Sequence, residues 1–246
     1  MPKGSSQTKQ INKKPKWPVI IVLLIGVVFI PLTVFAVKYV IEIRTKALPT
    51  EDPKNLEITN IVDTSFSVSW TTSSQETKGY IKYSNTTDLK NIAYDKRDNN
   101  NKQEEYSVHY IDVSDLNANT TYYFVVYVGG TEYKNSDNGP YQVQTGSVID
   151  SITVPQPIRG TIEDPYEEDE EVIVYLYAQN SQGISSKLST LTQNKNYTFD
   201  LSNLRDSKLD DIFTDLDGST LYITADGAGR GEGSVKTEII NLSSYD

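Results

Sequence analysis

Carboxylates are the most concentrated chemistry-bearing residues of this chain. Seven of them fall within nine positions, namely Glu163, Asp164, Glu167, Glu168, Asp169, Glu170 and Glu171. Carboxylate oxygens at this density could collect calcium, which takes about six to eight oxygen ligands. The alternative is a solvated loop whose charge discourages pairing at a sheet edge. We predict the solvated, metal-free loop, because so many adjacent carboxylates cannot all be buried without cationic partners.

A second set of acids, Asp211, Asp215 and Asp217 before Gly218, faintly resembles a calcium-binding loop. An EF-hand needs ligands at alternate positions, then a fixed glycine and a late glutamate, and the spacing here does not complete that pattern. A β-turn with Asp217 and Gly218 at its centre accounts for the same residues. We predict the turn.

Groups for nucleophilic or redox chemistry are scarce. The chain has no cysteine and one histidine, His109, which removes thiol nucleophiles, cysteine zinc sites and most histidine-dependent reactions. His109 shares parity with Ile111 and Val113 on a predicted strand, so we expect a structural histidine at the edge or in the core of a sheet. The glycine-rich segment 227–233 lacks the Gly-Lys-Ser/Thr of a phosphate-binding loop and is predicted to be a hairpin tip. We therefore predict no enzyme, no catalytic residue, no metal site and no cofactor.

The N-terminal region sets the location of everything after it. Residues 17–37 carry no charge, and five lysines precede them. As a helix this run reaches about 32 Å, enough to cross a hydrocarbon core of about 30 Å. Because lysines stay on the cytoplasmic side, we predict a cytoplasmic tail over 1–16, a single transmembrane helix over 17–45 that contacts membrane lipid, and extracytoplasmic residues beyond it.

A cleaved signal peptide is the alternative for the same stretch. Val34-Phe35-Ala36 has the small residue that precedes a cleavage site, and Pro31 would break the helix just before it. The apolar run is longer than a usual signal core, and it is followed by further apolar residues, so we favour the uncleaved anchor. Both alternatives export the same C-terminal part.

Charge separates the two ends of the chain. Residues 1–46 hold eight basic residues and one acid, whereas the remainder holds 15 basic and 32 acidic residues. So acidic an exported part repels nucleic acid, and we predict that nucleic acid is not a partner. Residues 46–54 contain two prolines and no apolar periodicity, which indicates a stiff linker.

Over the next hundred residues, apolar and polar side chains recur with a period of two. In residues 65–70, serines alternate with Phe66, Val68 and Trp70, which gives the strand one apolar and one hydroxyl face. Further strands are predicted at Leu56–Ile61, Gly79–Tyr83, Tyr106–Val113, Thr121–Val128 and Tyr141–Thr145. Short strands separated by polar turns predict an all-β sandwich over 55–147.

The residues of this sandwich carry a family resemblance. Residues 58–61 with 65–71 resemble the first strand and the tryptophan-bearing second strand of a fibronectin type III domain, and 116–122 (LNANTTY) resembles its Leu-x-Pro-x-Thr-x-Tyr corner. That corner implies that the Tyr122 hydroxyl bonds back to nearby backbone. His109-Tyr110-Ile111-Asp112-Val113 is similar to the sandwich that precedes the catalytic domain of purple acid phosphatases. The phosphatase domain needs several histidines, so this resemblance implies a module without that activity.

A second immunoglobulin-like sandwich is predicted over 155–246. Residues 148–154 are a short connection, and Pro155 and Pro157 mark the boundary. Strands are predicted at Pro157–Ile162, Val172–Ala178, Tyr197–Leu201, Thr220–Ala225 and Val235–Ile240. Their sequences resemble carboxypeptidase-regulatory-like or collagen-adhesin repeat domains. Few contacts are expected to cross the connection.

The predicted fold is thus an all-β ectodomain of two immunoglobulin-like sandwiches preceded by one transmembrane α-helix. Such a protein is expected at the cell membrane, where it would serve in adhesion, in surface scaffolding or in binding an unknown protein or glycan. The alternative is an accessory or substrate-binding subunit of an exported hydrolase such as a metallophosphatase. Seventeen tyrosines fit a binding surface, although tyrosine is also favoured in any strand.

Overall fold

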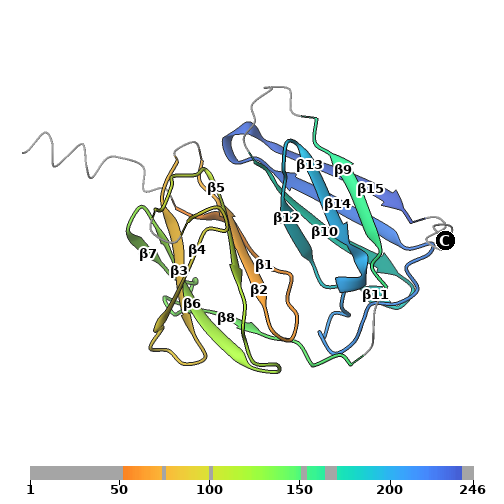
Figure 1. Ribbon diagram of the computed structural model, residues 1–246, viewed down its shortest axis with the longest axis horizontal. Helices are drawn as coiled ribbons and strands as arrows, with labels where there is room; N and C mark the ends of the chain where they lie inside the picture. The colour runs from red at the N-terminus through yellow and green to blue at the C-terminus, as the bar shows by residue number, and fades with distance from the viewer. Residues whose placement is uncertain (1–51, 74–75, 100–101, 151–153, 164–170, 240–246) are drawn as a thin grey trace, which may run out of the picture. The chain divides into compact units, whose positions relative to one another are not determined.

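A computed structural model describes most of the chain from residue 52 onward (Figure 1). The described residues are 52–73, 76–99, 102–150, 154–163 and 171–239. The predicted membrane helix over 17–45 and residues 164–170 of the acidic loop lie outside them. In the described part, no helix is both long and apolar enough to cross a membrane. Residues Glu51–Asp246 form one compact unit.

The first sandwich has two antiparallel sheets. One sheet has the strand order β1-β2-β5, with β1 (Lys54–Thr59), β2 (Phe66–Thr71) and β5 (Val108–Val113). The other has the order β4-β3-β6, with β4 (Asn91–Tyr94), β3 (Gly79–Ser84) and β6 (Thr121–Val128). Strands β7 (Thr131–Tyr133) and β8 (Tyr141–Gln144) pair with opposite ends of β6. The predicted sandwich is confirmed, and the short strands β4 and β7 are additions to it.

The apolar face of β2 lies in the core of this sandwich. The core cluster contains Phe66, Val68, Trp70, Ile81, Ile111, Val113, Leu116, Tyr122, Phe124, Val126, Val128 and Val143. Trp70 has no exposed surface, as its place in the strand pattern predicts. The backbone N–H of Asn117 donates to the Tyr122 hydroxyl at 3.0 Å, so the predicted tyrosine corner is confirmed.

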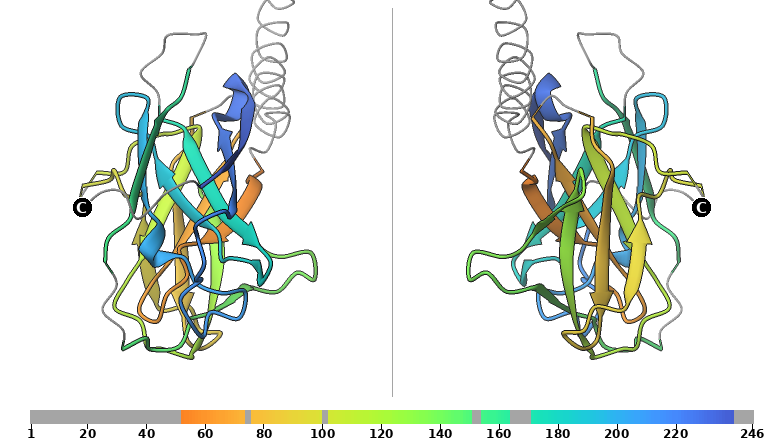
Figure 2. Two further views of the ribbon diagram at one scale, coloured as in Figure 1. Left: turned by 90° about the vertical axis from the view of Figure 1, so that its right-hand side faces the viewer. Right: turned by 90° about the vertical axis from the view of Figure 1, so that its left-hand side faces the viewer.

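The second sandwich is built around a five-stranded sheet. Its order is β11-β10-β14-β15, with β11 (Gly183–Ile184), β10 (Ile173–Asn180), β14 (Thr220–Asp226) and β15 (Glu232–Glu238), and β12 (Leu188–Leu191) also pairs with β10. Strands β9 (Pro157–Thr161) and β13 (Asn196–Asp200) form the second sheet. Short 3₁₀ turns η1 (Leu201–Asn203) and η2 (Ala228–Arg230) follow β13 and β14. Strands β14 and β15 are the blue hairpin of Figures 1 and 2.

The core of the second sandwich is separate from that of the first. It contains Val174, Leu176, Ala178, Leu188, Phe199, Leu201, Leu204, Phe213, Leu221, Ile223 and Ile239. These residues come from both sheets and from η1, so the two layers bury one common apolar interior.

Candidate functional site

The hydroxyl face of β2 is buried against the second sandwich. Ser67, Ser69 and Thr71 are each no more than 3% exposed. The Ser69 Oγ lies 2.9 Å from the Tyr175 hydroxyl of β10, and the Thr71 hydroxyl donates to Asp226 at 3.5 Å. A buried hydroxyl without a partner costs about 1–3 kcal/mol, so these partners make burial of this polar face possible.

Asn60, directly after β1, binds the backbone of β12 and of Lys187 just before it. Its backbone N–H donates to the Lys187 carbonyl at 3.0 Å. Its side-chain Oδ1 accepts from the Ser189 N–H at 2.9 Å, and its Nδ2 donates to the Ser189 carbonyl at 3.0 Å. The Asn60 side chain therefore satisfies both backbone polar groups of one residue in the other sandwich. Its φ of +51° lies in the left-handed region that asparagine tolerates.

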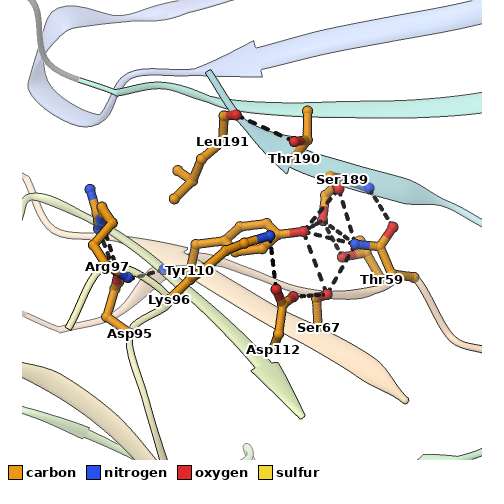
Figure 3. A network of polar contacts seen from close by, with 11 residues as sticks. Thr59, Ser67, Asp95, Lys96, Arg97, Tyr110, Asp112, Ser189, Thr190 and Leu191 are labelled. Carbon is orange, nitrogen blue, oxygen red and sulfur yellow. Dashed lines mark hydrogen bonds and ion pairs between the residues drawn. The ribbon is translucent and has the colours of Figure 1, made fainter. Parts of the chain in front are cut away.

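Tyr110 carries the same network across from β5 (Figure 3). Its hydroxyl donates to the Ser189 carbonyl at 2.8 Å and accepts from Asn60 Nδ2 at 2.8 Å. The Ser67 hydroxyl donates to Asp112 at 2.6 Å on the same side of the network. Burial raises the pKa of Tyr110, which keeps its hydroxyl protonated and able to donate.

Apolar side chains fill the centre of this contact between the two sandwiches, which we call the joint. One buried cluster joins Val108 and Tyr110 of β5 to Ile173, Tyr175 and Leu191 of the second sandwich. All five are no more than 9% exposed. The joint thus combines an apolar centre with paired polar groups, which is the composition of a stable interface.

Charged pairs close the joint at its margins. The Arg205 guanidinium lies 3.0 Å from Asp63 and donates to the Ser147 carbonyl at 2.6 Å. Lys187 and Glu57 form a second pair at 2.9 Å. The expectation that few contacts cross the connection over 148–154 is therefore wrong. Serines at alternate positions of a strand predict a hydroxyl face, but this pattern is the same whether the face contacts water or another sandwich.

A polar cleft of about 560 Å³ lies beside Arg97. Arg97 pairs with Asp95 at 2.8 Å and with Glu171 at 2.7 Å, and its guanidinium lies 3.5 Å from the centre of the Tyr106 ring. The remaining charged residues of the cleft, Glu76 and Glu105, are exposed carboxylates. Because Arg97 is fully engaged, the cleft has little to offer an anion.

His109 lies in the core of the first sandwich, which is one of the two positions expected for it. Its ring stacks on Trp70 at 4.8 Å and its Nε2 lies 3.0 Å from the Thr77 hydroxyl. Burial lowers the pKa of His109 to about 4, against a smaller opposite effect of Asp95, so the imidazole is neutral at pH 7. A Cβ at Gly79 would lie 2.4 Å from His109 Nδ1, which explains the glycine. The histidine is enclosed by packing and does not face a ligand cleft.

Tyrosines form rows on the outer sheet faces. In the first sandwich Tyr80 pairs across strands with Tyr94 and Tyr127, and the Tyr80 and Tyr127 rings stack at 4.6 Å. In the second sandwich Tyr177 and Tyr222 stack at 4.7 Å. Tyr94 is 47% exposed and is the open end of the first row. Stacked rings turn their faces to each other, so Tyr94 is the ring best placed to contact a partner.

The other residues singled out in the sequence have plain structural roles. The Ser219 N–H donates to the Leu216 carbonyl at 2.9 Å, which confirms the β-turn centred on Asp217 and Gly218. Residues 227–231 of the glycine-rich segment 227–233 connect β14 to β15, as predicted for a hairpin tip. Of the acidic loop, only Glu163 and Glu171 are described, and Glu171 pairs with Arg97.

The described residues hold no group of three His, Cys, Asp or Glu side chains positioned for a metal ion.

The joint was not predicted from the sequence. Two signals in the sequence could have found it. On β2, serines occupy the face opposite that of Trp70, and on β5, Val108 and Tyr110 make the face opposite that of His109 and Ile111 apolar as well.

Comparison with known families gives one match, and it covers the first sandwich. Residues 53–145 match the purple acid phosphatase N-terminal domain. The predicted resemblance of this sandwich to the phosphatase N-terminal domain is therefore shown. The resemblance of the second sandwich to carboxypeptidase-regulatory-like or collagen-adhesin repeats stays a prediction.

Two solved structures resemble this chain at low identity and low TM-score. A two-domain fibronectin type III segment of chicken tenascin has 14% identity and a TM-score of 0.22, over 75% of this chain and 97% of the segment. A pullulanase from Anoxybacillus sp. LM18-11 has 8% identity and a TM-score of 0.21, over 78% of this chain and 28% of the enzyme. No curated protein matches the sequence.

Proposed function

We propose that this chain is a membrane-anchored extracytoplasmic protein without catalytic activity. Its two sandwiches act as one rigid platform for adhesion, surface scaffolding or the binding of a protein or glycan. The observation that carries the proposal is the joint, in which Asn60 and Tyr110 bind Ser189 over a shared apolar cluster. Domains in one chain move relative to each other unless their interface is large and apolar or well paired. A fixed joint suits a platform that presents a surface in one orientation.

The anchoring part of the proposal rests on the lysine-rich tail and the uncharged run over 17–37. Protease added to intact cells is expected to remove the sandwiches and to leave a membrane fragment of roughly the first 45 residues, as positive-inside topology requires. A soluble product that begins at Val37 would instead establish a cleaved signal peptide.

The binding part of the proposal places the contact surface at the open end of the first tyrosine row. Ile92 and Tyr94 of β4 are 46% and 47% exposed. Tyr94→Ala with Ile92→Ala in the full chain is expected to reduce retention of purified cell-envelope protein or glycan at least several-fold. Ile184→Ala on β11 is the matched control, because Ile184 is 49% exposed on the other sandwich. Equal retention by both variants and the parent would contradict this surface.

The family match favours one second candidate, an accessory subunit of an exported hydrolase. In that case the full chain would co-purify from membranes with a phosphatase or glycosidase activity that the purified chain lacks. Co-purification that survives the Tyr94 and Ile92 substitutions would place the enzyme contact elsewhere on the first sandwich.

A further inference from the structure

The strand β15 is an edge strand of the second sandwich among the described residues. Among the strands that the structure describes, it pairs with β14 alone, in continuous register from Glu232 opposite Asp226 to Glu238 opposite Thr220. The strand has seven residues and contains no proline. It therefore lacks two of the devices that usually blunt a sheet edge, namely a short length and a proline.

The side chains of β15 are exposed on both faces of the sheet. All seven residues are exposed, and Val235, opposite the buried Ile223, is 61% exposed. Val235 thus points to the interior side of the sheet, yet it is left uncovered. An added strand would cover this side chain and pair the free backbone groups of β15.

The charges on β15 are self-complementary. Glu232 and Lys236 lie on the same face of the strand, four residues apart, and no ion pair between described residues engages either of them. Their contacts are neutral: Asn55 Nδ2 donates to Glu232 at 3.0 Å, and the Lys236 ammonium lies 5.2 Å from the centre of the Tyr222 ring.

We infer that β15 pairs antiparallel with β15 of a second copy of this chain, with Ser234 on the two-fold axis. Such an isologous contact places each residue opposite its mirror position on the same sheet face. In this register Glu232 lies opposite Lys236 twice. A register centred on Val235 would instead place Glu232 opposite Glu238 twice, so like charges disfavour it. A register centred on Thr237 would pair Lys236 with Glu238, but residues 232–235 would lie opposite no residue of β15.

Cysteine cross-linking in the full chain tests this contact. The chain has no cysteine, so Ser234→Cys introduces the only thiol. Opposite residues in antiparallel strands have Cα atoms about 4.5–5.5 Å apart, which suits a disulfide. Mild oxidation of membranes is expected to give a disulfide-linked dimer for Ser234→Cys and not for Thr131→Cys, an exposed control on β7. Absence of a dimer for Ser234→Cys, or a dimer at Val235→Cys in its place, would overturn the inference.

Charge reversal tests the register independently. In the Ser234→Cys chain, Glu232→Lys or Lys236→Glu alone places like charges opposite each other, and cross-linking is expected to fall several-fold. When the two variants are co-expressed, every such position again carries opposite charges in the mixed dimer, so cross-linking between the two differently tagged chains should return. Cross-linking that ignores these substitutions, or that does not return in the mixture, would contradict the charge-selected pairing.

Discussion

The two faces of β2 are equally buried but are chemically opposite. Phe66, Val68 and Trp70 lie in the core of the first sandwich, while the hydroxyls on the other face meet the second sandwich. The apolar face stabilises by removing area from water, which is non-directional. The hydroxyl face gains little from area and depends on matched partners, which fix orientation. Burial alone therefore does not distinguish a core from a joint.

The largest expected effect comes from the apolar face. Trp70→Ala removes a ring with no exposed surface and should lower the free energy of unfolding by about 3–5 kcal/mol. Because the joint couples the sandwiches, the loss should appear in the unfolding transition of both sandwiches together rather than in that of the first sandwich alone. Circular dichroism during chemical denaturation measures this. A parent-like transition would show that Trp70 does not anchor the core.

The neutral histidine behind Trp70 should make the same core sensitive to acid. The pKa of His109 is about 4 in the folded chain, against 6.5 when it is unperturbed. Between these values the unfolded chain binds more protons, so stability is full above about pH 6.5 and falls as pH drops toward 4, by about 3 kcal/mol in total. His109→Gln should flatten this part of the stability profile. An unchanged slope would assign the acid sensitivity to other groups.

On the hydroxyl side, Asn60→Gly should loosen the contact between the two sandwiches. Glycine keeps the left-handed backbone at φ +51° without strain while removing the bonds to Ser189. We expect a loss of about 2 kcal/mol, because the polar groups of Ser189 lose their partner. Hydrogen exchange should increase on both sides of the joint while both core clusters stay protected. Loss of core protection would mean that Asn60 supports the fold rather than the joint.

The smallest expected effect concerns a single pair across the joint. Ser69→Ala leaves the Tyr175 hydroxyl without its 2.9 Å partner and should cost about 1 kcal/mol. Tyr175→Phe in the same background should add less than it does alone, since the two side chains share one hydrogen bond. Strict additivity in this double-mutant cycle would show that the pair does not interact in solution.

The sequence predicted what short-range patterns encode. The bounds of β6 match the strand predicted over Thr121–Val128, and the tyrosine corner was predicted from residues 116–122. Strands β4, β7, β11 and β12 were missed because they span only two to four residues, too few for a period to register.

The joint could not be predicted for a different reason. It depends on which residue of β12 meets Asn60, a contact that spans more than a hundred positions. Nothing in the local pattern of either segment encodes that meeting. The single histidine, by contrast, was expected at the edge or in the core because its parity matched the apolar residues beside it, and the structure places it in the core.

The central claim, that the two sandwiches form one rigid unit, is tested most directly by a distance measurement between them. Because the full chain has no cysteine, Thr131→Cys and Ser181→Cys introduce two unique spin-label sites, both exposed and one on each sandwich. Pulsed electron paramagnetic resonance should give one narrow distance distribution that broadens on Asn60→Gly. A broad distribution in the parent chain would contradict a rigid joint.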